Sequence, residues 1–232
     1  MQSQSKENSF KVAIYGGNGF VGSHIAKELT KHDICTVCVS RTGHKPLHLR
    51  DKPWSESVRW CKGDASQPDT SFLKSIDAIV VCVGSAPLPT FSQEAYDRAV
   101  FMNGISNVNA IDAAGEAGVK QLVLLSAQIP QLLRTDKFAY TKGKRLALQA
   151  AENFSKRSVD HRAVVFQPGA IFGTRHLTSG KSLPLSLMMK PLSYVMPWQF
   201  ICVEQLAQRV VNELLDQDIS RPQFSVLKNS VI

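Results

Sequence analysis

A glycine-rich turn near the N-terminus constrains the fold more than any other segment. It reads Tyr15-Gly16-Gly17-Asn18-Gly19-Phe20-Val21-Gly22, and it connects the apolar run 11–15 to a helix-patterned segment over 20–31. Such a turn suits a pyrophosphate: the first glycine permits a tight bend, the middle one lets the backbone approach the phosphates, and the last lets the helix pack closely. The free N–H groups and positive dipole of the helix start add attraction for anions. The turn therefore predicts a dinucleotide site formed by Gly16, Asn18, Gly19, Phe20 and Val21.

Apolar β-rich runs alternate with helix-patterned segments along the rest of the chain. The expected strands cover 11–15, 35–40, 58–62, 77–83, 121–126, 162–167 and 224–227, and the expected helices 20–31, 93–117, 138–156 and 203–215. This alternation is typical of an α/β fold with a parallel sheet and crossover helices. We expect one domain over 1–232, a doubly wound sheet in the order 3-2-1-4-5-6-7, and a small substrate-facing cap over 173–202. The segment 173–199, rich in Pro, Ser and Gly, also suits a meandering surface loop.

The end of the second expected strand bears on which nucleotide is bound. A site selective for NAD places Asp or Glu there to hold the ribose 2′-hydroxyl. This chain instead has Ser40 and Arg41, followed by Thr42 and Gly43, with no acid. An arginine can form a fork of hydrogen bonds to a 2′-phosphate, although an exposed loop arginine is the simpler interpretation. The pattern favours NADP(H) over NAD(H).

A second group of residues suits acid–base chemistry. Tyr140 and Lys144 are four residues apart, so on a helix they share one face, and Ser126 ends the fifth expected strand. A lysine ammonium beside a phenol should lower the pKa of that phenol, which suits proton exchange with a carbonyl or alcohol oxygen. Taken alone, a Tyr and a Lys at this spacing are usually an ordinary exposed pair.

Charge and cysteine content bear on partners and compartment. The formal charge of +8 indicates either a solvated basic surface or attraction to phosphates, but no aromatic array or basic stripe favours nucleic acid. Cys35 and Cys38 lie in one expected strand and point to opposite faces, so no metal site is expected, and five such cysteines fit a reducing compartment. The polar first ten residues lack a secretory or transit pattern, which leaves the cytoplasm as an alternative location.

With these residues in place, the chain resembles the extended and atypical short-chain dehydrogenase/reductase family from about residue 11 to 215. The resemblance rests on Gly63-Asp64, Val81-Cys82-Val83-Gly84, the helix from Asn103 to Ala114, Leu124-Leu125-Ser126, and Gln167-Pro168-Gly169 with Phe172-Gly173-Thr174-Arg175. It implies that Ser126, Tyr140 and Lys144 are catalytic and that Lys144 also binds the nicotinamide ribose. It further implies cofactor contacts by Asp64, Ala65, Val83, Gly84, Pro168 and Gly169. Gln167 stands where the family usually has arginine, a real departure.

The resemblance is narrowest to the NAD(P)H-binding accessory subunit of mitochondrial complex I and related proteins of the ubiquinone-biosynthesis complex. It implies a mitochondrial, inner-membrane-associated protein on the matrix side that reduces a small hydrophobic carbonyl or quinone-type substrate. The alternative is a non-catalytic nucleotide-binding subunit that assembles or stabilises a respiratory or quinone-biosynthesis complex. The segment 181–190 is apolar with basic ends, which suits peripheral membrane contact, but the favoured interpretation is that it lines a hydrophobic slot or packs on the core.

Overall fold

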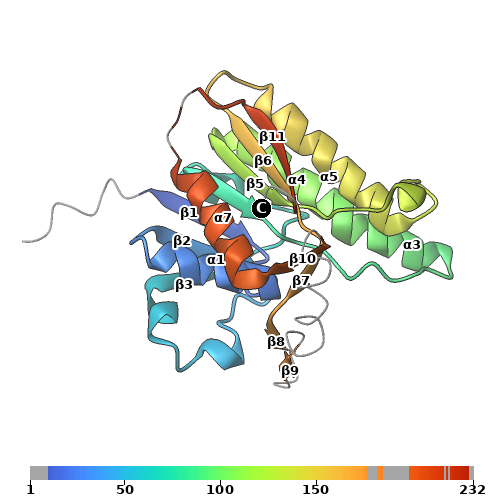
Figure 1. Cartoon of the computed structure of the whole chain (residues 1–232). Coiled ribbons are helices and arrows are strands. Elements are labelled where there is room, and N and C mark those ends of the chain that lie inside the picture. The colour runs from blue at the N-terminus through green and yellow to red at the C-terminus, as the bar shows by residue number, and fades with distance from the viewer. Residues whose placement is uncertain (1–9, 177–181, 185–198, 217, 219, 230–232) are drawn as a thin grey trace, which may run out of the picture.

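The computed structural model describes residues 10–176, 182–184, 199–216, 218 and 220–229. Seven parallel strands form one sheet in the order β11-β6-β5-β4-β1-β2-β3 (Figure 1). Counting β11 as the seventh strand, this is the predicted 3-2-1-4-5-6-7 order, so the doubly wound parallel sheet is confirmed. The strands are β1 (Lys11–Tyr15), β2 (Cys35–Ser40), β3 (Val58–Lys62), β4 (Ala78–Val81), β5 (Gln121–Leu125), β6 (Arg162–Gln167) and β11 (Phe224–Lys228).

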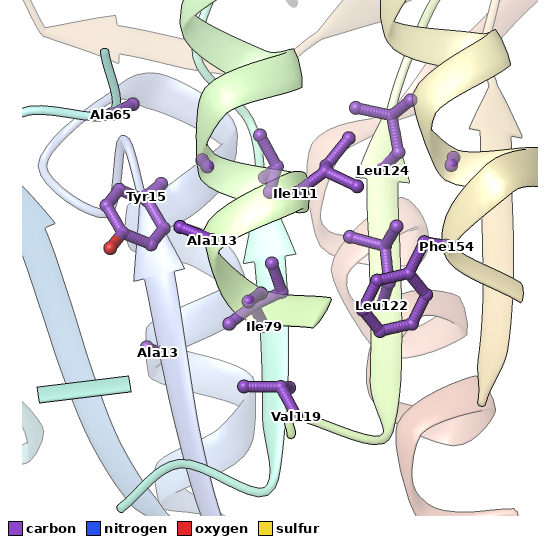
Figure 2. Close-up of a cluster of buried hydrophobic side chains, with 14 of the residues drawn as sticks. Ala13, Tyr15, Ala65, Ile79, Ile111, Ala113, Val119, Leu122, Leu124 and Phe154 are labelled. Atoms are coloured by element: carbon purple, nitrogen blue, oxygen red, sulfur yellow. The ribbon is translucent and has the colours of Figure 1, made fainter. Parts of the chain in front are cut away.

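Helices cover both faces of the sheet. One face carries α1 (Phe20–Thr30) and α7 (Val203–Leu215), and the other carries α3 (Gln93–Val100), α4 (Ser106–Ala117) and α5 (Ala139–Ser155). The central strands are buried on both faces, as parallel strands under two helix layers must be. In β1, Val12 and Ile14 face α1 and α7, whereas Ala13 and Tyr15 face α4. Figure 2 shows the hydrophobic cluster on the α4 and α5 face, in which Ile111 of α4 and Phe154 of α5 lie over Ile79, Leu122 and Leu124 of the sheet.

Several helix and strand ends differ from the predictions by a residue or two. The largest difference concerns 93–117, where the predicted single helix contains a π-helical turn, η3 (Phe101–Ile105), between α3 and α4. The predicted strand 77–83 is shorter, because β4 ends at Val81 and the chain then leaves the sheet edge. Short elements without strong periodicity were not predicted: α2 (Thr70–Leu73), η1 (Leu47–Leu49), η2 (Pro53–Ser57) and η4 (Gln131–Leu133).

The region of the predicted cap contains short strands outside the main sheet. β7 (Ala170–Phe172) pairs in parallel with β10 (Phe200–Cys202), and β8 (Thr174–His176) pairs antiparallel with β9 (Ser182–Pro184). Residues 177–181 and 185–198, including most of the apolar segment 181–190, lie outside the described residues. In the described part of the chain, no helix is both long and apolar enough to cross a bilayer.

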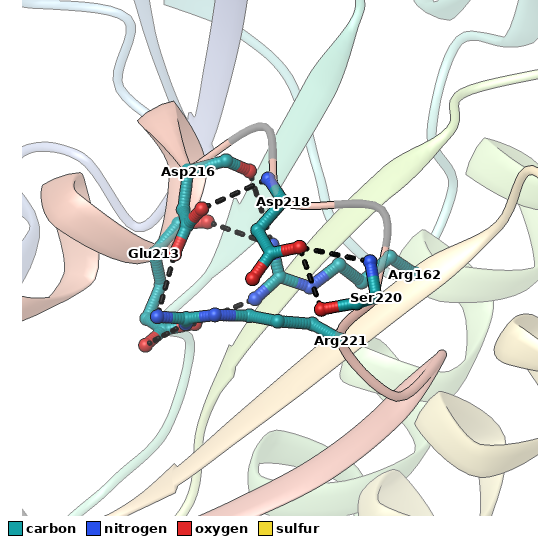
Figure 3. Close-up of polar contacts among 6 residues, drawn as sticks. All are labelled: Arg162, Glu213, Asp216, Asp218, Ser220 and Arg221. Atoms are coloured by element: carbon teal, nitrogen blue, oxygen red, sulfur yellow. Dashed lines mark hydrogen bonds and ion pairs between the residues drawn. The ribbon is translucent and has the colours of Figure 1, made fainter.

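A network of charged side chains attaches the end of α7 to the sheet (Figure 3). Arg162 of β6 pairs with Glu213 of α7 at 2.7 Å, and Arg221 pairs with Glu213 at 2.9 Å and with Asp216 at 2.6 Å. The Arg162 and Glu213 side chains are only 16% and 17% exposed, so solvent screens this pair weakly. The network therefore positions the chain where it turns from α7 towards the edge strand β11.

We expect Glu213→Gln to lower the free energy of unfolding by about 1–2 kcal/mol, because it leaves two guanidinium groups without their shared carboxylate. Urea denaturation followed by circular dichroism measures the change. Glu94→Gln is the matched control, since Glu94 pairs with Arg98 with both side chains mostly exposed, and it should change stability by less than about 0.5 kcal/mol. Equal effects of the two variants would contradict a structural role for the network.

Candidate active site

The glycine turn has the predicted conformation. It follows β1 and ends at Gly19, which caps α1 with φ −80° and ψ 177°. The Gly16 N–H donates to Val39 of β2 at 3.0 Å, and the Gly19 N–H donates to the Gly16 carbonyl at 2.9 Å. A Cβ on Gly22 would lie 2.3 Å from the Gly16 carbonyl oxygen, so only glycine lets α1 lie this close to the turn. The first turn of α1 contains no acidic residue to compete with an anion for its free N–H groups.

A cavity of about 210 Å³, called the nucleotide-sized cavity below, lies over this turn at the carboxyl ends of β1, β2 and β4. This crevice is where open α/β sheets bind ligands. Of the predicted cofactor residues, it contains Gly16, Asn18, Gly19, Ser40, Arg41, Asp64, Ala65, Val83 and Gly84. Its other lining residues are Tyr15, Val39, Gly63, Cys82, Phe101, Met102 and Ser106. The last three come from η3 and α4, and no sequence motif indicated that they would line this cavity.

The remaining predicted cofactor residues lie outside this cavity. Phe20, Pro168 and Gly169 line a neighbouring, larger cavity, and Lys144 lines a third that also includes Ser126. Val21 is half-buried in α1 and packs against the core on the α7 side of the sheet. The structure therefore brings nine of the predicted residues into one cavity, places four in the two other cavities, and packs Val21 against the core.

The end of β2 presents hydroxyl groups and one guanidinium to the cavity. Asn18 Nδ2 donates to Thr42 Oγ1 at 3.3 Å, and Thr42 Oγ1 lies 3.4 Å from Ser40 Oγ. Arg41 is exposed and has no carboxylate partner among the described residues. Asp64 lies across the cavity, where its Oδ1 accepts from the Ser66 N–H and hydroxyl, both at 2.9 Å. This edge of the cavity is consequently able to receive a phosphate group.

Ser126, Tyr140 and Lys144 come together as predicted, at the end of β5 and on one face of α5. The Lys144 side chain is 7% exposed, and its Nζ donates to the Leu125 carbonyl at 3.0 Å. Its ammonium lies 5.8 Å from the centroid of the Tyr140 ring. A Cβ on Gly84 would lie 3.6 Å from Lys144 Nζ, so the lysine borders the nucleotide-sized cavity as well. Ser126 and Tyr140 both line the larger cavity beside it.

The close approach of α5 to η3 positions this group and was not predicted. A Cβ on Gly104 would lie 2.8 Å from the Gly143 Cα, so these two glycines let the backbones of η3 and α5 touch at the residue that precedes Lys144. Asn103, which is fully buried, stabilises the π-helical turn: its Nδ2 donates to Ala99 and Ser85, and its Oδ1 accepts from the Ser85 N–H. Single π-helical turns inside α-helices are frequent at functional sites.

Burial is the largest influence on the pKa values of Tyr140 and Lys144. The predicted lowering of the Tyr140 pKa is wrong, because this pKa is raised. Burial raises the pKa of the Tyr140 phenol to about 12, so the phenol keeps its proton at neutral pH. Burial also lowers the pKa of the Lys144 ammonium to about 8. Attraction to the Lys144 ammonium favours the Tyr140 phenolate, but desolvation of the phenolate is the larger effect on the pKa of this phenol.

The larger cavity, about 710 Å³, lies beyond Ser126 and Tyr140 and is mostly apolar. Phe20, Leu88, Ile129, Leu133, Phe138 and Ile171 supply much of its wall, and Arg175 is the one charged side chain among its described lining residues. Leu88, Leu133 and Phe138 are themselves exposed at 72%, 43% and 47%. A cavity of this size and character accommodates an apolar ligand with few polar groups.

Comparisons with known proteins agree with this geometry. The NAD dependent epimerase/dehydratase family matches residues 12–190. An Arabidopsis thaliana protein described as "Uncharacterized protein At1g32220, chloroplastic" is 33% identical over 191 residues, which are 81% of this chain and 59% of the relative. MIOREX complex component 2 of Saccharomyces cerevisiae is 39% identical over 62 residues, 26% of this chain and 22% of the relative. The chain thus spans less than two-thirds of either curated relative.

Solved structures share the fold at low sequence identity. UDP-glucuronic acid 4-epimerase from Bacillus cereus, in complex with NAD, has a TM-score of 0.70 at 14% identity over 94% of this chain and 78% of that one. A short-chain dehydrogenase/reductase from Serratia marcescens has a TM-score of 0.67 at 14% identity over 94% and 95% of the two chains. The resemblance to extended short-chain dehydrogenase/reductases is confirmed, and the chain belongs to the NAD dependent epimerase/dehydratase family.

Proposed function

We propose that this protein binds NADP(H) and interconverts a carbonyl and an alcohol on a hydrophobic substrate. The observation that carries the proposal is the position of Lys144. It borders both the nucleotide-sized cavity at Gly84 and the group formed by Ser126 and Tyr140, which opens into the apolar cavity. A cofactor and a substrate bound in the two cavities would meet at these three side chains.

The residues present fit a dinucleotide. Gly19 lines the cavity directly beside the free N–H groups of α1, where a side chain would fill the space needed by a pyrophosphate. The family is named for NAD, and solved neighbours hold NAD. We nevertheless propose a preference for NADP(H) in this chain, because the end of β2 offers Arg41, Ser40 and Thr42 and has no carboxylate to hold a ribose 2′-hydroxyl.

The side chains of the site can manage the proton that a carbonyl reduction needs. When bound, the nicotinamide supplies the hydride for reduction or accepts it in the reverse direction. Tyr140 holds its proton at neutral pH and can donate it to the oxygen that becomes the alcohol, while Ser126 can hydrogen-bond the same oxygen. The Lys144 ammonium, 5.8 Å from the ring centroid, stabilises the phenolate that remains.

We expect calorimetric titration to show tighter binding of NADPH than of NADH, and Arg41→Ala to weaken NADPH binding about 10- to 100-fold. A charge-assisted hydrogen bond to phosphate contributes roughly 1.5–3 kcal/mol, which corresponds to that loss. NADH affinity should stay within about twofold. Arg59→Ala is the matched control, since Arg59 is an exposed arginine of β3 outside the cavity. Equal affinities for both nucleotides, or equal effects of the two variants, would contradict the assignment of Arg41.

For substrate and setting, we propose a quinone-type or other hydrophobic carbonyl compound in an organelle, with mitochondrial quinone biosynthesis as the specific context. The apolar walls of the large cavity support the substrate class, and the relative named as chloroplastic supports an organelle. Arg175 is positioned to pair with one anionic group of such a substrate. Membership in a protein complex is part of this proposal, supported by the similarity to MIOREX complex component 2 over 62 residues.

That similarity also favours a second candidate function, a nucleotide-binding subunit that stabilises a complex without turnover. The two candidates differ in what Tyr140→Phe does. In the catalytic case the variant loses reduction of quinone-type substrates while keeping NADPH affinity and complex assembly. In the structural case it matches the wild type in every assay, including restoration of assembly in cells that lack the protein.

A further inference from the structure

A separate cavity, of about 430 Å³, lies beside α1 and shares none of the lining residues of the nucleotide-sized cavity. It is lined by Ser23, His24, Lys27, His48, Leu49, Lys52, Trp54 and His176. These residues come from α1, from the η1–η2 segment and from β8, three elements far apart in the sequence (Figure 1). The proposed oxidoreductase function uses none of them.

The histidines form one cluster. The rings of His48 and His176 are stacked, with centroids 3.9 Å apart and planes 13° from parallel. His24 lies close enough that its charge, together with burial and the charge of His176, lowers the pKa of His48, with burial the largest cause. Stacked imidazoles at this distance repel each other when both are protonated, so an anion beside them would favour protonation.

The charged groups around the cluster leave it positive. No carboxylate is among the described lining residues, and neither Lys27 nor Lys52 forms an ion pair with a carboxylate in the described part of the chain. Glu204 of α7 lies 3.7 Å from His24 Nε2 and also accepts a hydrogen bond from Cys202 at 2.6 Å. Its side chain is 57% exposed, so it borders the cluster without filling the cavity.

The geometry does not suit a metal ion. His24 Nδ1 is occupied by the Phe20 carbonyl at 2.8 Å, and its other ring nitrogen faces Glu204. Among the described residues, no group of three or more His, Cys, Asp or Glu side chains is arranged to hold a metal. The cavity instead suits an anion carried on a larger molecule, because it is lined by two ammonium groups, several imidazoles and an indole ring.

We propose that this cavity binds a tetrahedral oxyanion of the phosphate-ester class, held by Lys27, Lys52 and His48, with the stacked ring of His176 beside it. Such an anion would accept hydrogen bonds from both lysines and from His48, and Trp54 would contact the group that carries it. Because β8 supplies both His176 here and Arg175 in the apolar cavity, occupancy would also steady the wall of the substrate cavity. The proposal is independent of the oxidoreductase function.

Sulfate is the first probe, because its charge stays constant between pH 5.5 and 8. Histidine Cε1–H resonances are followed by NMR during titration with sulfate at an ionic strength held constant with chloride. We expect saturable shifts of His48 and His176 and a rise of at least about half a pH unit in the titration midpoint of His48. Binding should tighten as the pH falls, because protonated imidazole is the form that attracts an anion.

Lys52→Met and Lys31→Met separate this site from general charge effects. Both remove one positive charge, but Lys31 pairs with Glu28 at 2.6 Å at the end of α1 and lies outside the cavity. Lys52→Met should weaken sulfate binding at least fivefold, and Lys31→Met should leave it unchanged. Equal effects, or shifts reproduced by chloride alone, would overturn the proposal. Loss of the response in Arg41→Ala would also overturn it, by assigning the anion to the nucleotide cavity.

Two further arms identify the source of the phosphate group. Inorganic phosphate should displace sulfate, as expected for any phosphate ester. Co-sedimentation with phosphatidylcholine vesicles containing phosphatidic acid then tests a lipid headgroup. Binding to these vesicles that Lys52→Met reduces and Lys31→Met preserves would assign a lipid. Without it, the sulfate and phosphate results assign a soluble phosphate ester.

Discussion

Gly22→Ala is expected to abolish nucleotide binding and to lower the free energy of unfolding by about 2–3 kcal/mol. The new Cβ would lie 2.3 Å from the Gly16 carbonyl oxygen and 2.9 Å from the Gly17 Cα. Both are backbone atoms, so the turn itself must move away from α1, and the N–H groups that face the cavity move with it. Calorimetric titration with NADPH should show at least a 100-fold loss of affinity, and urea denaturation should show the loss of stability.

Gly19→Ala is the matched variant, since it separates ligand contact from fold stability. Gly19 has a φ and ψ that any residue adopts, and the nearest atom to an added Cβ is 3.1 Å away. Gly19 lines the cavity, and an added Cβ would have one protein atom within 4 Å, so NADPH affinity should fall at least tenfold while stability changes by about 1 kcal/mol or less. Unchanged NADPH affinity in Gly19→Ala would mean that the phosphates do not pass this turn, and unchanged stability in Gly22→Ala would contradict the close packing.

The sheet was predictable from the sequence because its signals are local. The limits of β2 and β6 coincide with the predicted β-rich runs 35–40 and 162–167. The rules for crossover connections leave a few parallel strand orders, and the resemblance to the short-chain dehydrogenase/reductase family implies the one that is observed. The glycine turn and the polar end of β2 are also local, so the residues around the nucleotide-sized cavity could largely be predicted.

The parts that could not be predicted depend on contacts between distant segments. Nothing in the pattern of 93–117 indicates the π-helical turn, which arises where Asn103 reaches Ser85 and Gly104 meets Gly143. The pairing of β7 with β10 joins residues about thirty positions apart across a segment without periodicity. The pKa of Tyr140 follows from its burial, which only the assembled fold determines. The same is true of the stacked histidines 48 and 176.

Lys144→Met is expected to stabilise the protein at pH 7 and to leave its stability nearly unchanged at pH 10. Burial lowers the pKa of the Lys144 ammonium from 10.5 to about 8, so the folded state disfavours the charged form by about 3 kcal/mol. Below pH 8 the lysine is charged in both states and the full cost is present. Between pH 8 and 10.5 the folded state releases its proton first, and the free energy of unfolding of the wild type rises with pH.

Methionine removes that cost but also removes the hydrogen bond to the Leu125 carbonyl, which contributes about 1 kcal/mol at either pH. The variant should therefore be more stable than the wild type by about 2 kcal/mol at pH 7. At pH 10 a cost of roughly 0.8 kcal/mol remains, because the unfolded lysine is still mostly protonated, so the two proteins should differ by less than about 0.5 kcal/mol. Urea denaturation of both proteins at each pH measures the difference, in which every other titrating group cancels. Lys156→Met, at an exposed lysine paired with Glu152, should show the same small difference at both pH values.

A difference between Lys144→Met and the wild type that does not change with pH would contradict the burial of this ammonium. The expected result would show that the protein keeps a charged group where an apolar one is more stable at neutral pH. Residues retained at a cost in stability are characteristic of functional sites. Loss of carbonyl reduction in a variant that is more stable than the wild type would then assign Lys144 to the chemistry, because unfolding could not explain the loss.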